Sequence, residues 1–125
     1  MPRKFKLGPL QRKWVAYLKK YPWKQTRGRL GKRRGPDNEK MCCLGVLGVL
    51  AKTCSWENGI LREKKSRVSE VLSASFKEVG LRSPSGAIDR GPLALSIMND
   101  SGVYTWVDIA YIVEAIPEAF FTKSV

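Results

Sequence analysis

Residues 41–52 constrain the fold more than any other part of this 125-residue chain. Their sequence, MCCLGVLGVLAK, is apolar on every side, so the segment must be buried, either as a helix or as a strand. Its length favours a helix. Gly45 and Gly48 would let a neighbouring element approach it closely. The rest of the chain therefore has to supply the elements that cover this segment.

Two longer stretches show the spacing of amphipathic helices. Residues 9–21 place apolar side chains three and four positions apart, and Pro22 ends the pattern. Residues 66–79 begin with Ser66, a good N-cap residue, and stop at Gly80, a good C-terminal residue. Both stretches are predicted to pack an apolar stripe against the buried segment.

Two shorter helices are expected in the C-terminal third. Pro92 can begin a short helix that runs through residue 98, before the turn-forming sequence Asn-Asp-Ser-Gly. Thr105 and Asp108 form an acidic variant of the capping box, which predicts a helix over residues 106–116. Pro117 then closes that helix.

The β content is expected to be small. Asn58-Gly59 within residues 55–62 is a strong type I′ turn signal, so this stretch predicts a short hairpin. The sum is a mostly α domain, within the α+β class, of four or five helices with one possible hairpin. Residues 1–8 are expected to form a flexible basic arm, and residues 9–125 a single globular domain.

Basic side chains are concentrated at the start of the chain. Residues 1–40 hold 14 of the 23 basic side chains and two acidic ones, Asp37 and Glu39, whereas the remaining 85 residues are neutral in sum. The formal net charge of +12 therefore belongs to one third of the sequence. Such asymmetry attracts phosphate polyanions, anionic lipid headgroups or an acidic protein surface.

The densest part of this charge lies in residues 23–38, which we expect to be an extended segment or loop. Arginine offers planar donor pairs that match phosphate oxygens, and glycine allows close backbone approach. A solvated linker is the alternative for such a composition. Trp23 is the best candidate for base stacking, because Trp14, Tyr17 and Tyr21 have the spacing of core residues. The predicted anion-binding residues are Lys19, Lys20, Trp23, Lys24, Arg27, Arg29, Lys32, Arg33 and Arg34.

Catalytic constellations are sparse in this sequence. Histidine is absent, which removes the commonest general base and metal ligand. Three cysteines, Cys42, Cys43 and Cys54, make neither a disulfide framework nor a zinc site by themselves, although a thiol at a helix N-terminus can become nucleophilic. The carboxylates Asp89, Asp100 and Asp108 each have a turn or capping role. We therefore expect no enzyme, no cofactor and no metal.

The chain also lacks targeting signals. Its longest apolar run is about half the roughly 20 residues of a membrane-spanning helix, and residues 1–10 have no apolar signal-peptide core. Together with the odd number of cysteines, these features predict an intracellular protein without a membrane partner. The sequence leaves the oligomeric state open.

Several short motifs resemble a set of small phage and prophage accessory proteins. The similar segments are YPWKQ at 21–25, CCLGVL at 42–47, MNDSG at 98–102 and the Ile109-Ala110 pair in the following helix. This chain differs in its denser basic segment and in its middle part. The resemblance implies a phage-encoded protein that acts in the cytoplasm of a host bacterium, where such accessory proteins often inhibit defence systems.

Charge and resemblance together predict a non-enzymatic inhibitor, of the anti-CRISPR kind, that engages RNA, DNA or a host nucleoprotein complex through its basic N-terminal part. The alternatives are a protein–protein inhibitor steered onto an acidic host surface, a sponge for a signalling nucleotide and, least expected, a cysteine- or carboxylate-dependent enzyme.

Overall fold

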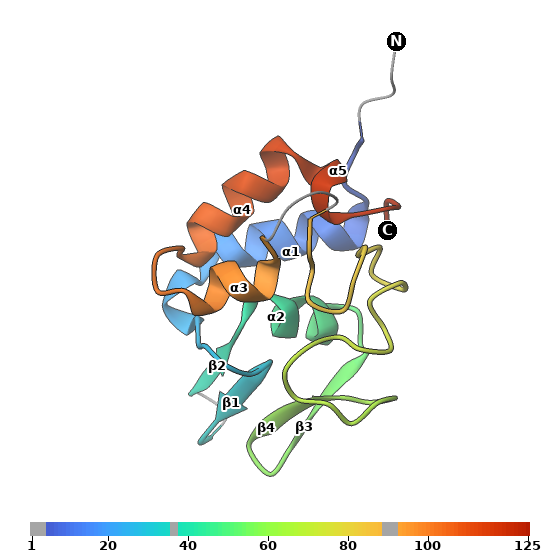
Figure 1. Ribbon diagram of the computed structural model, residues 1–125. Helices are drawn as coiled ribbons and strands as arrows, with labels where there is room; N and C mark the ends of the chain where they lie inside the picture. Colours follow the sequence, from blue (N-terminus) through green and yellow to red (C-terminus); the bar gives the residue numbers. More distant parts are fainter. Residues whose placement is uncertain (1–4, 36–37, 89–92) are drawn as a thin grey trace.

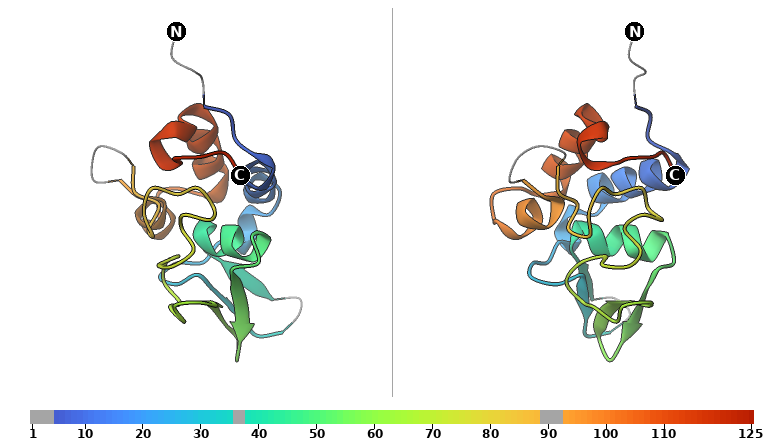
Figure 2. Two further views of the ribbon diagram at one scale, coloured as in Figure 1. Left: turned by 90° about the vertical axis from the view of Figure 1, so that its right-hand side faces the viewer. Right: turned by 45° about the vertical axis from the view of Figure 1, so that its right-hand side comes forward.

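The chain folds into helices and one antiparallel sheet arranged in layers, and the computed structural model describes residues 5–35, 38–88 and 93–125. In sequence order the elements are α1 (Pro9–Lys20), the 3-10 helix η1 (Pro22–Lys24), β1 (Gly31–Arg33), β2 (Glu39–Met41), α2 (Cys43–Leu50), β3 (Cys54–Glu57), β4 (Ile60–Glu63), α3 (Leu95–Asp100), α4 (Trp106–Ala115) and α5 (Pro117–Phe120). Figure 1 and both views of Figure 2 place the sheet at one end, α1, α4 and α5 at the other, and α2 between them.

Helix α2 is the buried centre of the fold, as its sequence predicts. Residues 43–48 are all buried, and α2 packs against α1, α3, β2 and β3. Gly45 lies against Leu30, the residue before β1: a Cβ atom on Gly45 would overlap the Leu30 backbone carbonyl. The carbonyl oxygen of Leu30 also accepts a hydrogen bond from the Cys42 N–H at 2.8 Å. Backbone therefore meets backbone here, which only a glycine permits.

The prediction of a mostly α domain is wrong, because the chain forms a four-stranded antiparallel sheet and the fold is α+β. The strand order is β2-β1-β4-β3. The predicted hairpin is confirmed as β3 and β4, with positive φ angles of 50° at Asn58 and 81° at Gly59. The second hairpin, β1 and β2, lies partly in the segment expected to be a loop. Its strands are three residues long, too short for an alternating pattern to show in the sequence.

Helices α1 and α4 are confirmed, and they pack against each other. Thr105 Oγ1 accepts a hydrogen bond from the Asp108 N–H at 3.3 Å, and the Thr105 N–H donates to the Asp108 carboxylate at 3.0 Å. This is the predicted capping box. Pro117 does end α4, but it also begins the short helix α5.

The helix predicted over residues 66–79 is wrong, since this stretch consists of turns. The cause is Glu63, whose side chain is fully buried at the end of β4. Its carboxylate accepts hydrogen bonds from the N–H groups of Ala74 and Ser75, both at 2.8 Å, and from the hydroxyls of Ser66, Ser73 and Ser75. Serine side chains that bond elsewhere compete with helix formation.

Helix α3 begins at Leu95, and Pro92, its predicted start, lies outside the described residues. The same holds for residues 1–4 of the predicted basic arm. Within the rest of that arm, Phe5 and Leu7 pack against the core, and the Lys6 carbonyl accepts a hydrogen bond from the Ser124 hydroxyl.

Candidate functional site

Side-chain alternation divides β1 and β2 into a core face and an outer face. Gly31 pairs with Met41 and Lys32 pairs with Lys40. Met41 is buried against α2, so the two lysines lie on the outer face. Like charges directly opposite each other destabilise an antiparallel pair. The outer face of this hairpin therefore carries an electrostatic cost that an anion would relieve.

Three open hollows of the protein surface meet around these strands. One, of about 420 Å³, includes Arg29, Lys32, Arg33, Arg34 and Lys40 in its lining. A second, of about 500 Å³, shares Lys32 and adds Arg27, and a third shares Arg33 and Arg34 with the first. Neighbouring hollows therefore share cationic side chains in their linings. We call the six cationic residues that line them the basic surface: Arg27, Arg29, Lys32, Arg33, Arg34 and Lys40.

Few carboxylates neutralise the basic surface. Within the described ranges, Arg33 is the only one of its six residues in an ion pair, with Glu39 at 3.6 Å. Arg33 also lies over the ring of Trp56, 4.9 Å from its centroid. Asp37 lies outside the described residues. The other five cations thus have no acidic partner in the described part of the chain.

In the other half of the same sheet, β3 and β4, the charges are paired with each other. Glu57 on β3 pairs with both Arg62 and Arg67, whose side chains come from β4 and from the turn after it. The guanidinium of Arg67 holds the pKa of the Glu57 carboxyl below its usual value. Among the described residues, the β1–β2 half of the sheet therefore carries more unpaired positive charge than the β3–β4 half.

A buried polar cluster holds the loop that leads into β1. Asn99 is fully buried, and its side-chain oxygen accepts hydrogen bonds from the Cys43 N–H and the Trp106 indole N–H, both at 3.1 Å. Its amide nitrogen donates to the Thr26 carbonyl at 2.7 Å. The sequence suggests a turn residue at Asn99, and this part of the interpretation is wrong, because Asn99 lies in α3 and joins segments far apart in the chain.

Gln25 and Asp100 extend this cluster to the basic surface. The Gln25 side chain accepts a hydrogen bond from the Trp106 N–H at 3.1 Å and donates to the Tyr104 carbonyl at 3.1 Å. The Asp100 carboxylate accepts from the Gly28 N–H at 3.0 Å. Because Gly28 stands between Arg27 and Arg29, these bonds fix the backbone from which both guanidinium groups project. Asp100, which the sequence offers as a candidate catalytic carboxylate, thus makes a structural contact to the loop before β1.

An aromatic row borders the basic surface. The ring centroids of Tyr17 and Tyr21 are 4.7 Å apart, and those of Tyr21 and Trp23 are 5.6 Å apart. Lys24 lies 4.9 Å from the centroid of the Tyr21 ring, and Lys20 lies 5.4 Å from it. The row is tied to the basic surface by Lys40, whose Nζ donates to the Trp23 carbonyl at 2.7 Å.

The structure brings together most, but not all, of the residues singled out by the sequence. Five of them, Arg27, Arg29, Lys32, Arg33 and Arg34, lie on the basic surface, and Lys20, Trp23 and Lys24 gather on the aromatic row beside it. Lys19 is directed elsewhere, to Glu114 and the Tyr111 ring of α4. Sequence reasoning missed Lys40, although its position opposite Lys32 would follow once the second hairpin is recognised.

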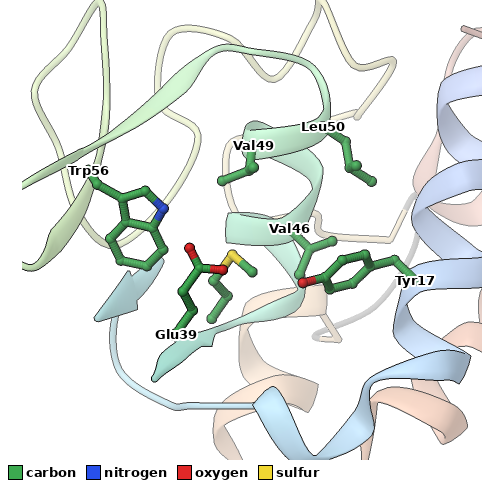
Figure 3. A pocket seen from close by; sticks show the side chains of 7 residues that line it. Tyr17, Glu39, Val46, Val49, Leu50 and Trp56 are labelled. Atoms are coloured by element: carbon green, nitrogen blue, oxygen red, sulfur yellow. The ribbon is translucent and has the colours of Figure 1, made fainter. Parts of the chain in front are cut away.

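A small, mostly apolar cavity lies between α1, α2 and strands β2 and β3, and is shown in Figure 3. Tyr17 and Trp56 stand on opposite sides of it, with Glu39 between them. The cavity offers about 50 Å³, whereas ligand pockets usually provide roughly 300–1,000 Å³. A nucleotide does not fit into this space. The sponge alternative would therefore need the open basic surface rather than this cavity.

The candidate nucleophiles are deeply placed. Burial raises the pKa of the Cys42 thiol to about 12 and that of Cys54 to about 11, and it raises the pKa of Cys43 well above its usual range. Asp108 is engaged in its capping box, and Asp89 lies outside the described residues. No cluster of three or more cysteine and carboxylate residues in the described ranges could hold a metal ion.

Comparison of the chain with protein-family models, with curated proteins and with solved structures finds no match. The resemblance to phage accessory proteins therefore stays a prediction. Among the described residues, none of the helices has the length and apolar character needed to cross a bilayer. The case for a function rests on the basic surface and the residues around it.

Proposed function

We propose that this protein binds nucleic acid, without chemically altering it, by seating backbone phosphates on the basic surface. The observation that carries the proposal is the unbalanced half of the sheet: five cations on one hollowed surface have no acidic partner in the described ranges. In the setting that the resemblance implies, this binding would inhibit a bacterial defence system from within the host cytoplasm.

Phosphate suits the basic surface in its chemistry. Four of its six members are arginines, whose planar donors match phosphate oxygens. Lys32 and Lys40 are direct cross-strand neighbours. Like charges on directly opposite residues destabilise an antiparallel pair. A phosphate between the two ammonium groups would turn this repulsion into attraction.

The hollows are also open rather than enclosed, which suits a chain of phosphates that passes across them. Each phosphate that is neutralised releases condensed counterions, so affinity must fall as salt rises. Contacts with four to six phosphates predict a slope of about −4 to −5 for the logarithm of duplex affinity against the logarithm of salt concentration.

The test is a titration of fluorescein-labelled DNA and RNA oligonucleotides, followed by anisotropy at several salt concentrations. The double variant Lys32→Glu, Arg34→Glu should weaken binding strongly and reduce the magnitude of the salt slope by about 2. The matched control is Lys77→Glu, Lys123→Glu, which makes the same charge change. Both control residues are exposed, and neither lines the three hollows around β1 and β2.

Equal losses in the two double variants would show that net charge alone attracts the polyanion, and an affinity independent of salt would reject the proposal. Two outcomes would favour other partners. Capture of a single host protein after nuclease treatment would indicate a protein–protein inhibitor, and release of a nucleotide upon heat denaturation would indicate a nucleotide sponge.

A further inference from the structure

Trp23 differs from the other tryptophans of the chain in its exposure. Its side chain is 64% exposed, whereas Trp14 and Trp106 are fully buried and Trp56 is partly buried under Arg33. A large aromatic ring left in water gains nothing from the hydrophobic effect. Tryptophan in such a position is typical of contact surfaces, where its ring can cover a partner.

The position of Trp23 is fixed by its surroundings. It belongs to η1, which begins with Pro22, and the Gln25 N–H closes this turn on the Pro22 carbonyl at 3.3 Å. The ring meets the Tyr21 ring at an interplanar angle of 75°, and Tyr21 in turn packs on Tyr17. A single edge-to-face contact leaves at least one face of the indole open. Little conformational entropy is therefore lost when that face is covered.

Trp23 also lies next to the basic surface. Its carbonyl accepts the hydrogen bond from Lys40, which lines one hollow, and its neighbour Pro22 lines the hollow that contains Arg27 and Lys32. A group stacked on the indole would thus continue into a chain of phosphates on the basic surface. An aromatic platform beside a cationic groove is the arrangement that proteins use for unpaired nucleic acid strands.

We infer that the preferred ligand is a single-stranded nucleic acid, with one base stacked on Trp23 and the adjoining phosphates on the basic surface. This inference rests on the proposed function and makes it more specific. In a duplex the faces of the bases are covered by their neighbours, so the indole has no base face to contact. Stacking is tolerant of sequence because every base has a π face, so little sequence preference is expected.

The first experiment compares a labelled 12-nucleotide single strand, without self-complementarity, with the corresponding duplex. Trp23→Ala should weaken single-strand binding by about 5- to 150-fold and change duplex binding less than about 2-fold. Trp23→Phe, which keeps a stacking ring, should restore most of the affinity. Tyr111→Ala is the matched control, because Tyr111 is 61% exposed but lies on α4, against Lys19.

A second measurement reports on the ring itself. Intrinsic fluorescence excited at the tryptophan band should be quenched when the single strand is added to the wild-type protein. Most of the quenching should be lost in Trp23→Phe, because Trp14 and Trp106 are buried and Trp56 is covered by Arg33. Thermal unfolding of each variant verifies that the fold is retained, since an exposed residue contributes little to stability.

The outcomes separate this inference from the function on which it rests. The stacking inference is overturned if Trp23→Ala weakens the binding of single strand and duplex equally, or weakens the binding of neither, and the fluorescence is unchanged. In that case the effect of Lys32→Glu, Arg34→Glu can still support phosphate binding. If no nucleic acid binds in a salt-dependent way, the proposed function itself fails.

Discussion

The cluster around Asn99 allows a quantitative test of how the loop before β1 is held. Replacing Asn99 by alanine removes the partners of three groups: the Cys43 N–H, the Trp106 indole N–H and the Thr26 carbonyl. The Gln25 side-chain amide still donates a hydrogen bond to the Tyr104 carbonyl, so it retains a partner. A buried polar group without a partner costs about 1–3 kcal/mol. The variant should therefore lose about 3–5 kcal/mol, with the upper end limited by water that enters the space left behind.

Urea denaturation followed by circular dichroism measures this loss. With a slope near 2 kcal/mol per molar urea, a loss of about 4 kcal/mol moves the midpoint down by about 2 M at an unchanged slope. Asp100→Asn is the control, because an asparagine retains the oxygen that accepts from the Gly28 N–H, and its loss should stay below about 1 kcal/mol. A loss below 1 kcal/mol in Asn99→Ala would refute the assignment of Asn99 as the buried centre of this network.

Three further predictions concern other parts of the chain. Gly45→Ala should lower the free energy of unfolding, measured by urea denaturation, by several kcal/mol, because the added methyl group would overlap the Leu30 backbone. Gly35→Ala is the control and should leave stability nearly unchanged, since no described atom lies within 4 Å of the added carbon. Similar losses in the two variants would contradict this packing. Burial alone would raise the pKa of Glu63, but the hydrogen bonds that it accepts outweigh burial and hold the pKa below the usual 4.5. The ionised Glu63 carboxylate therefore stabilises the fold above pH 4.5, and this stabilisation is lost as the pH falls through the folded-state pKa. Glu63→Gln should lower the free energy of unfolding by about 2 kcal/mol at pH 7 and by progressively less in acid. A loss of stability that does not depend on pH would contradict this prediction. The three thiols should react with Ellman's reagent at pH 8 only after unfolding, since burial raises their pKa values, and rapid labelling of the folded protein would contradict this.

The elements that could be predicted are those whose signals are local. Helix α4 is specified by the capping box between Thr105 and Asp108, the β3–β4 hairpin by its two turn residues, and α2 by unbroken apolar character. Each of these signals acts within a few positions of the element that it determines.

The missed elements depend on distant partners. The Leu30 N–H, just before β1, bonds to the Ser69 carbonyl, and the Thr26 N–H bonds to the Met41 carbonyl, so neither strand of the second hairpin forms from its own sequence alone. The segment after Ser66 has helical spacing, yet the buried carboxylate of Glu63 draws its amides and hydroxyls into turns. Hydrogen bonds from groups ten or more positions further along the chain do not appear as a periodic pattern in the sequence.

The candidate site likewise combines features that local sequence reveals with features that depend on distant contacts. Composition alone points to the basic segment, because arginine and lysine are dense there. The sequence does not reveal which cations share a surface: Lys40 joins it through strand pairing, whereas Lys19 leaves it for Glu114 on α4. The role of Asn99 in holding the loop is visible only when residues 70 or more positions apart are brought together.

The contact of Gly45 with the carbonyl of Leu30 has a consequence for how such a protein can change over generations. Leu30, the residue that leads into β1, is held by main-chain contacts to Gly45 of the core helix and to Cys42, the N-cap of that helix, and the cationic side chains take no part in these contacts. Substitution on the outer face can therefore change the charge of this surface while the frame beneath it stays the same. Under the proposed function, such substitutions would change which nucleic acid is bound without altering the contact at Gly45.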